Sequence, residues 1–140
     1  MFKAFLNGLH DRRGVAAVEF ALIVPVLALV VAGINDGAQQ ILMQNNMHSG
    51  VSAAAQYVMS GGSDLSTAQA VGLSAWPSHS DSATMIAAKA CYCGGATGDC
   101  GTLCPDQTVP AAYITITAGD TYSGWYMTRQ ISTNQTVRVR

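Results

Sequence analysis

The sequence predicts an α+β protein in which a long N-terminal helix, transmembrane at its start and amphipathic further on, packs on a small antiparallel sheet. Three observations predict this fold. An apolar run with a single charge occupies residues 15–34, apolar residues then recur at helical spacing to about Ser60, and clear β-branched alternation occurs only in the C-terminal half. A helix and a sheet with one apolar face each bury those faces against one another, so two layers are expected.

The amino-acid composition leaves little room for a soluble enzyme or a nucleic-acid-binding protein. The chain has 140 residues, of which 49% are hydrophobic and only 11% charged, against about 25% charged residues in soluble domains. Its net charge of -1 provides no field that would concentrate nucleic acid, and no aromatic residues are interleaved with basic clusters. We expect one modest domain and a membrane segment, with no nucleic-acid partner and no small-molecule substrate.

The run from Val15 to Ile34 has the length of a transmembrane helix. It reads VAAVEFALIVPVLALVVAGI, with Glu19 as its only charge, and about 20 apolar residues match the ~30 Å hydrocarbon layer. The next basic residue after the run is Lys89, whereas three precede it: Lys3, Arg12 and Arg13. The positive-inside bias therefore keeps the N-terminus in the cytoplasm and exports residues 35–140.

A secretory signal peptide is the alternative interpretation of this segment. Residues 20–32 would be its apolar region, and Val30-Val31-Ala32 resembles a small-residue cleavage site. Glu19 argues against it, because a carboxylate in hydrocarbon costs about 2.5 to 3.5 kcal/mol at the helix centre and less near the interface. A disposable leader gains nothing from that cost, so Glu19 indicates a function with a partner.

A processing motif opens the membrane helix. The residues in order are Arg12, Arg13, Gly14, Val15, Ala16, Ala17, Val18, Glu19 and Phe20. This segment resembles class III prepilins, and RRGVAAVEFALIVPVLALVVAG is similar to the opening of the TadE-like minor pilins (pseudopilins) of the tight-adherence pilus assembly system. The best match covers about a sixth of the chain, and a pilin-like fold is what it implies.

The resemblance implies processing and assembly at a bacterial inner membrane. An aspartic prepilin peptidase would cleave after Gly14 and leave Val15 as the new N-terminus, with Arg12, Arg13, Glu19 and Phe20 in recognition and assembly. Glycine suits the cleavage position because it lets an extended backbone approach the protease closely. The new α-amino group, with a pKa of about 8, would pair with Glu19 of a neighbouring subunit. The alternative is that Glu19 lies at the interface without a partner.

The resemblance also separates the related pilin classes. Type II secretion pseudopilins and type IV pilins favour phenylalanine at the first mature position, where this chain has Val15. The helices of major pilins of the tight-adherence system resemble this helix too, but those pilins are usually much shorter than this chain. The resemblance therefore favours a minor pilin over a filament-forming pilin. The implied partners are the membrane, the prepilin peptidase, other pilins or pseudopilins and the pilus assembly platform.

The helix is expected to continue beyond the membrane. Apolar residues recur mostly every three or four positions, namely Ala38, Leu42, Met43, Met47, Val51, Ala54 and Val58. Gly61-Gly62 would end the helix, Pro25 would kink it, and Ser63-Asp64 would cap a short helix from Leu65 to Leu73. The expected divisions are a leader at 1–14, a transmembrane helix at 15–34, its amphipathic continuation at 35–62 and a periplasmic α+β domain at 63–140.

Two to four strands are expected in the C-terminal half. Residues 84–93 alternate like a strand, although their alanines keep a helix open. Tyr113 to Thr117 is a clearer strand because β-branched and aromatic residues alternate there. A third strand is expected from Gln135 to Arg140.

Four cysteines, Cys91, Cys93, Cys100 and Cys104, lie between the first two expected strands. Export to an oxidising periplasm favours disulfides, each worth about 2 to 3 kcal/mol, over a zinc site or a redox-active pair. Three connectivities exist. A Cys91–Cys93 bond is the least favoured, because residues two apart on a strand lie too far apart for a disulfide without distortion. The nested pairing of Cys91 with Cys104 and Cys93 with Cys100 is preferred to the crossed one.

Nothing in the sequence assembles an active site. His10, His48 and His79 lie far apart in the chain, so we expect no enzyme, no metal and no cofactor. The leading hypothesis is a minor pilin that takes part in pilus assembly. The alternatives are an unprocessed single-pass protein whose disulfide-stabilised periplasmic domain binds a partner, a filament-forming pilin, and a redox or metal-binding enzyme.

Overall fold

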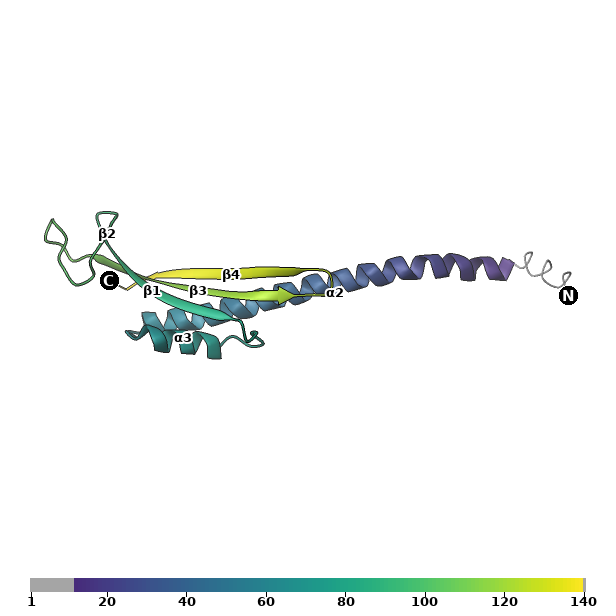
Figure 1. The fold of residues 1–140 in the computed structure, drawn as a ribbon, viewed down its shortest axis with the longest axis horizontal. Coiled ribbons are helices and arrows are strands. Elements are labelled where there is room, and N and C mark those ends of the chain that lie inside the picture. The colour runs from purple at the N-terminus through teal and green to yellow at the C-terminus, as the bar shows by residue number, and fades with distance from the viewer. Residues whose placement is uncertain (1–11, 140) are drawn as a thin grey trace. The chain divides into compact units, whose positions relative to one another are not determined.

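The computed structural model describes residues 12–139, with side chains from Ala16 onward. The elements in order are α2 (Arg12–Met59), α3 (Leu65–Ser74), β1 (Thr84–Cys93), β2 (Ala96–Gly98), β3 (Ala111–Ser123) and β4 (Thr128–Arg138) (Figure 1). The chain forms two compact units, Met1–Ala38 and Gln39–Arg140. We refer to them as unit 1 and unit 2 and describe each by itself.

Unit 2 has the predicted α+β architecture. Its sheet has the order β2-β1-β3-β4, and every neighbouring pair is antiparallel. The part of α2 that belongs to unit 2 packs on this sheet, and α3 lies beside β1 (Figure 1). The expected layering of one long helix on a small antiparallel sheet is therefore confirmed.

The core of unit 2 lies between α2 and one face of the sheet. The α2 residues that are buried in it follow the expected helical spacing: Met47, Val51, Ala54, Ala55 and Val58. Opposite them, alternate residues of β3 point inward because successive side chains of a strand face opposite sides; these are Ala112, Ile114, Ile116 and Ala118. Two residues of the expected stripe differ, since Ala38 and Leu42 are exposed.

The absence of a side chain at Gly50 and Gly72 lets α2 and the α3 region approach closely. A Cβ atom placed on Gly50 would lie 2.7 Å from the carbonyl oxygen of Gly72 and 2.9 Å from the Cβ of Trp76. Trp76 itself is 1% exposed, and its Nε1 has no hydrogen-bond partner among the described residues. The segment 75–77, expected as a loop, thus contributes a large side chain to the core.

The helix ends form where the sequence predicted them. The N–H of Gly62 donates to the carbonyl of Tyr57 (3.1 Å), and the N–H of Gly61 donates to the carbonyl of Val58 (3.1 Å). Gly61 has a φ of +94°. These two bonds form a Schellman motif, which favours glycine at the left-handed position. Asp64 caps α3 by accepting the N–H groups of Ser66 and Thr67. Hydrogen bonds from the hydroxyls and N–H groups of Thr67 and Ser66 lower the pKa of Asp64 to about 2.

The sheet confirms one predicted strand and departs from the sequence prediction in two other ways. Residues 84–93 form the predicted strand, and the alternative of a helix is wrong, because they pair along their length with β3. The strands β3 and β4 are longer than the expected 113–117 and 135–140, because they pair with each other as far as Ser123 and Thr128. The short strand β2 was not predicted, and Arg140 lies outside the described residues.

Candidate assembly helix and disulfide-bonded loops

The predicted cleavage position lies at the start of α2. The helix begins at Arg12, so the backbones of Arg13, Gly14 and Val15 belong to its first turn. Residues 1–11 of the predicted leader, including Lys3 and His10, lie outside the described residues.

Glu19 lies one helical turn after Val15, as the resemblance requires. Its side chain is exposed, and the neighbouring Phe20 is 67% exposed. One turn raises the chain by about 5.4 Å. This geometry leaves the Glu19 carboxylate accessible to a group from another molecule.

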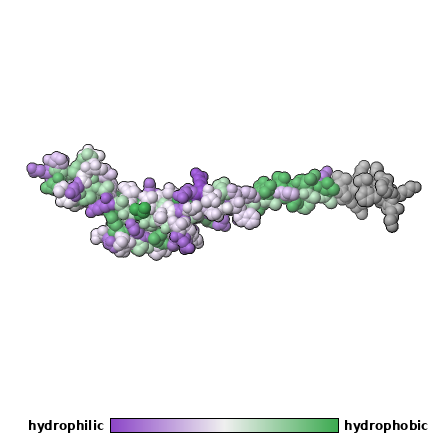
Figure 2. Space-filling view, viewed as in Figure 1, coloured by the Kyte–Doolittle hydropathy of each residue, from purple (hydrophilic) through white to green (hydrophobic). Residues whose placement is uncertain are grey.

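The helix around Glu19 exposes apolar side chains on all its faces. The large exposed ones between residues 18 and 34 are Val18, Phe20, Leu22, Ile23, Val24, Val26, Leu27, Leu29, Val30, Val31 and Ile34. Figure 2 shows the corresponding stretch of nearly continuous apolar colouring beside the grey residues. The helix continues through Pro25.

This apolar segment meets the length and composition of a membrane span. Its most apolar window has a mean hydropathy of 2.5, and none of that window is buried within the described chain. A core helix of a soluble protein would be mostly buried, although a signal sequence would also have this length and composition. Because exposed apolar surface is unfavourable in water, the segment indicates single-pass anchoring in a membrane.

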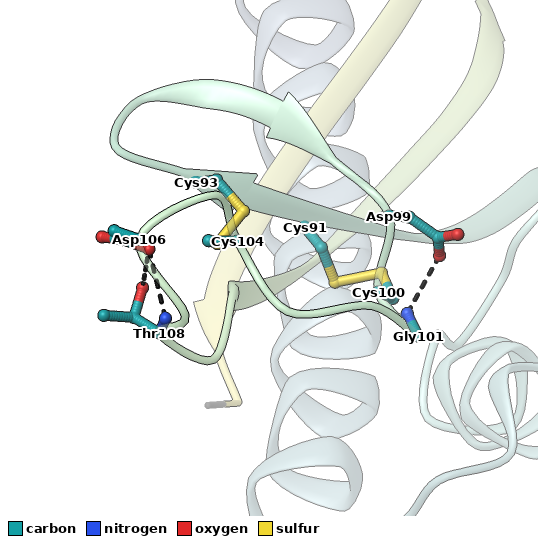
Figure 3. The surroundings of a disulfide bond; sticks show 8 residues. All are labelled: Cys91, Cys93, Asp99, Cys100, Gly101, Cys104, Asp106 and Thr108. Carbon is teal, nitrogen blue, oxygen red and sulfur yellow. Dashed lines mark hydrogen bonds between the residues drawn. A yellow bond between two sulfur atoms is a disulfide. The ribbon is translucent and has the colours of Figure 1, made fainter.

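Both disulfides join β1 to the loops that follow β2. Cys91 bonds to Cys100 with a Cα–Cα distance of 5.2 Å, and Cys93 bonds to Cys104 with 5.5 Å (Figure 3). Cys91 and Cys104 are buried. The four sulfurs are thus paired, so the zinc and redox interpretations would first require their reduction.

The preference for a nested pairing was wrong, because the structure has the crossed one. The reason is the hairpin between β1 and β2, whose register puts Gly98 opposite Cys91. Antiparallel pairing then carries the chain past Gly98 toward the start of β1, so Cys100 arrives beside Cys91 and away from Cys93. The chain turns back within the next few residues, and Cys104 reaches Cys93.

Two aspartates shape the loops around the disulfides. Asp99 accepts the N–H of Gly101 (2.9 Å), and Asp106 accepts the hydroxyl (2.7 Å) and N–H (3.1 Å) of Thr108 (Figure 3). The hydrogen bonds from Thr108 lower the pKa of Asp106. Each aspartate closes a local turn onto backbone two residues further on.

Sequence reasoning missed the one buried carboxylate that links distant segments of unit 2. Asp120 on β3 is 5% exposed and accepts the N–H (3.0 Å) and hydroxyl of Ser80 and the N–H of Thr121 (2.7 Å). Burial raises the pKa of Asp120. These hydrogen bonds and the nearby His79 together lower the pKa by more than burial raises it, so the pKa lies below its usual value. The 40-residue separation left no local signal of this contact.

The histidines and carboxylates do not assemble into a metal site in the part of the chain that the structure describes. Within residues 12–139, no three His, Cys, Asp or Glu side chains come together as a possible ligand set. His79 Nδ1 lies 2.7 Å from the carbonyl oxygen of Trp76. His48 Nε2 lies 3.4 Å from the hydroxyl of Thr133.

Comparison with known proteins identifies the N-terminal part of the chain. A family model described as TadE-like protein matches residues 14–56. No curated protein and no solved structure matches. The matched residues contain Glu19, the apolar segment and most of the buried stripe of α2, and this family is structural and associated with assembly of the tight-adherence pilus. Residues 14–56 are therefore similar to TadE-like proteins, as the processing motif indicated.

Proposed function

We propose that the chain is a minor pilin, or pseudopilin, that a prepilin peptidase cleaves after Gly14 and that then takes part in assembly of a tight-adherence pilus. One observation carries the proposal. Within the matched segment 14–56, Glu19 lies exposed on an apolar helix one turn after Val15. A carboxylate at that depth is costly in a bilayer unless it is paired.

In this proposal the energy for assembly comes from the apolar segment and its charge pair. Residues 15–34 anchor the precursor in the inner membrane, with residues 1–14 in the cytoplasm and the domain 63–140 in the periplasm. Cleavage creates a positive α-amino group at Val15, which pairs with Glu19 of a neighbouring subunit when the helices bundle. The disulfides stabilise the exported domain in an oxidising compartment.

N-terminal mass spectrometry of the protein from cells with an active prepilin peptidase tests the processing. A chain that begins at Val15 supports the proposal. A chain that begins at Met1 refutes it and favours the unprocessed single-pass protein, and a chain that begins at Gly33 favours secretion through a signal peptide. A Gly14→Leu variant is the control, because its bulky side chain should leave the leader attached.

Substitution of Glu19 tests the charge pair. We expect Glu19→Ala and Glu19→Gln to leave membrane insertion unchanged but to reduce the amount of assembled pilus, because both remove the charge. Glu19→Asp keeps the charge and should retain more assembly than either neutral variant. Pilus yields equal to the wild type from both neutral variants would refute the pairing.

A further inference from the structure

A groove lies at the C-terminal end of α2, over the inner face of the sheet, which is the face that packs against this helix. It encloses about 350 Å³ between Val58 and Met59 of the helix, residues 61–63 that follow it, and side chains from β1, β3 and β4. All of these residues belong to unit 2. We call this feature the helix-end groove. Its volume lies at the lower end of the range for ligand pockets, so a few side chains of another molecule fit into it.

Lys89 occupies a position on the inner face of β1 at which the neighbouring positions are apolar. Ala87 and Cys91 share its side of the strand and are buried, whereas Lys89 is exposed. Its register partner on β3 is Ile114, which is 4% exposed. The inner face is open at Lys89 because α2 ends at Met59, and both residues line the groove.

The charge of Lys89 has no counter-ion among the described residues that line the helix-end groove, since none of them is a carboxylate. Asp64 follows the lining residues directly in the chain, but its side chain caps α3. Arg138 also lines the groove and has a contact of its own within the chain, so we base the charge on Lys89 alone. The C-terminal end of α2 contributes only about half a negative charge, which leaves the groove positive.

One wall of the groove consists mainly of backbone. Gly61 and Ser63 are exposed, and a Cβ placed on Gly61 would meet no atom within 4 Å. Backbone without long side chains lets the main chain of another molecule approach closely, and its peptide groups are strong hydrogen-bonding groups. This wall favours a peptide over a lipid tail, because an acyl chain cannot form hydrogen bonds with peptide groups.

Exposed apolar side chains lie beside this charge. Met59 is 58% exposed and Val139 39%, and both line the groove. A partner that covers them removes apolar surface from water, which is favourable. A cation beside apolar surface and open backbone is complementary to a peptide in which a carboxylate stands next to an apolar side chain.

We propose that the helix-end groove is a docking site for an acidic peptide segment of a partner protein. A carboxylate of the segment pairs with Lys89, an adjacent apolar side chain contacts Met59 and Val139, and the main chain of the segment runs along residues 61–63. This contact does not depend on cleavage after Gly14. It gives unit 2 a protein contact of its own, in addition to the helix pairing of the proposed function.

Binding of two matched peptides to the full chain in a zwitterionic detergent tests the docking site. The first is a rhodamine-labelled hexapeptide with one glutamate between two leucines, and the second has glutamine in place of the glutamate. Fluorescence anisotropy measures the dissociation constant of each peptide. We expect the glutamate peptide to bind about fivefold more tightly, which is the upper value for an exposed ion pair.

Charge reversal at Lys89 locates the binding. Lys89→Glu should weaken binding of the glutamate peptide about tenfold, because attraction becomes repulsion. The matched control is Arg129→Glu, which makes the same change in net charge at an exposed residue outside the described lining of the groove and should change the affinity less than about twofold. A third peptide with lysine in place of glutamate should bind Lys89→Glu more tightly than the wild type, which also shows that the variant is folded.

Four results would overturn the docking site. They are equal affinity of the wild type for the glutamate and glutamine peptides, no binding of either at millimolar concentration, equal weakening by Lys89→Glu and Arg129→Glu, and no gain for the lysine peptide. Displacement of the peptide by a short-chain anionic phospholipid, but not by its zwitterionic counterpart, would overturn it in favour of a lipid headgroup. A dimer in sedimentation that Lys89→Glu dissociates would overturn it in favour of a second copy. None of these results bears on the N-terminal mass spectrometry that tests the proposed function.

Discussion

Gly50→Ala provides a sharp test of how closely α2 and the α3 region pack. The added Cβ would lie 2.7 Å from the carbonyl oxygen of Gly72 and 2.9 Å from the Cβ of Trp76. Neither atom is the end of a flexible side chain, so the backbone around α3 must move. Inserting one methyl group into a packed core costs typically about 1 to 3 kcal/mol, and contact with two fixed atoms places this site in the upper half of that range.

Helix propensity acts in the opposite direction and sets the net magnitude. Replacing glycine by alanine within a helix stabilises it by up to about 1 kcal/mol. We therefore expect Gly50→Ala to lower the free energy of unfolding of unit 2 by about 1 to 2 kcal/mol. The control is Gly37→Ala, which lies on the same helix with no atom within 4 Å of the added Cβ and should show no loss.

Urea unfolding of the full chain in detergent, followed by Trp76 emission, measures both variants. Trp76 is suited to the assay because it is 1% exposed and contacts the site of the change. A free energy of unfolding for Gly50→Ala equal to or above that of the wild type would refute the reasoning, because it would mean that α3 moves away without cost.

Two further predictions concern the disulfides and the buried carboxylate. A variant with Cys91→Ser and Cys100→Ser should keep the Cys93–Cys104 bond, show no free thiol and lose about 3 kcal/mol of stability. A variant with Cys93→Ser and Cys100→Ser should instead show two free thiols or a new Cys91–Cys104 bond. Thiol counting and mass spectrometry distinguish the two variants, and two free thiols in the first would refute the crossed pairing. The wild type should lose stability as the pH falls below 3.8, the ordinary value of Asp120, because the folded pKa lies lower and the unfolded state binds the proton first. Asp120→Asn should show a weaker dependence of the urea midpoint on pH in that range, and an unchanged dependence would contradict the assigned hydrogen bonds.

Local patterns made the N-terminal half and the helix ends predictable. The apolar run, the motif at residues 12–20 and the glycine pair 61–62 each depend on neighbours within a few positions in the chain. Helical spacing therefore sufficed to identify Met47, Val51 and Val58 as core residues, and all three are buried. The stripe failed at Ala38 and Leu42, because periodicity says which face is apolar and not how far along the helix the sheet extends.

Contacts between distant segments were decided only by the tertiary structure. The lengths of β3 and β4 depend on their mutual pairing, the crossed disulfides on the register of β1 with β2, and the bond between Ser80 and Asp120 on the packing of a loop against β3. None of these has a local signal, since partners far apart in sequence come together only after the chain has folded. The sequence by itself determined an apolar helix with one charge, similar to TadE-like proteins over residues 14–56, and the α+β type of the domain attached to it. The structure decided which sulfurs meet and how far β3 and β4 extend, because both follow from non-local strand pairing.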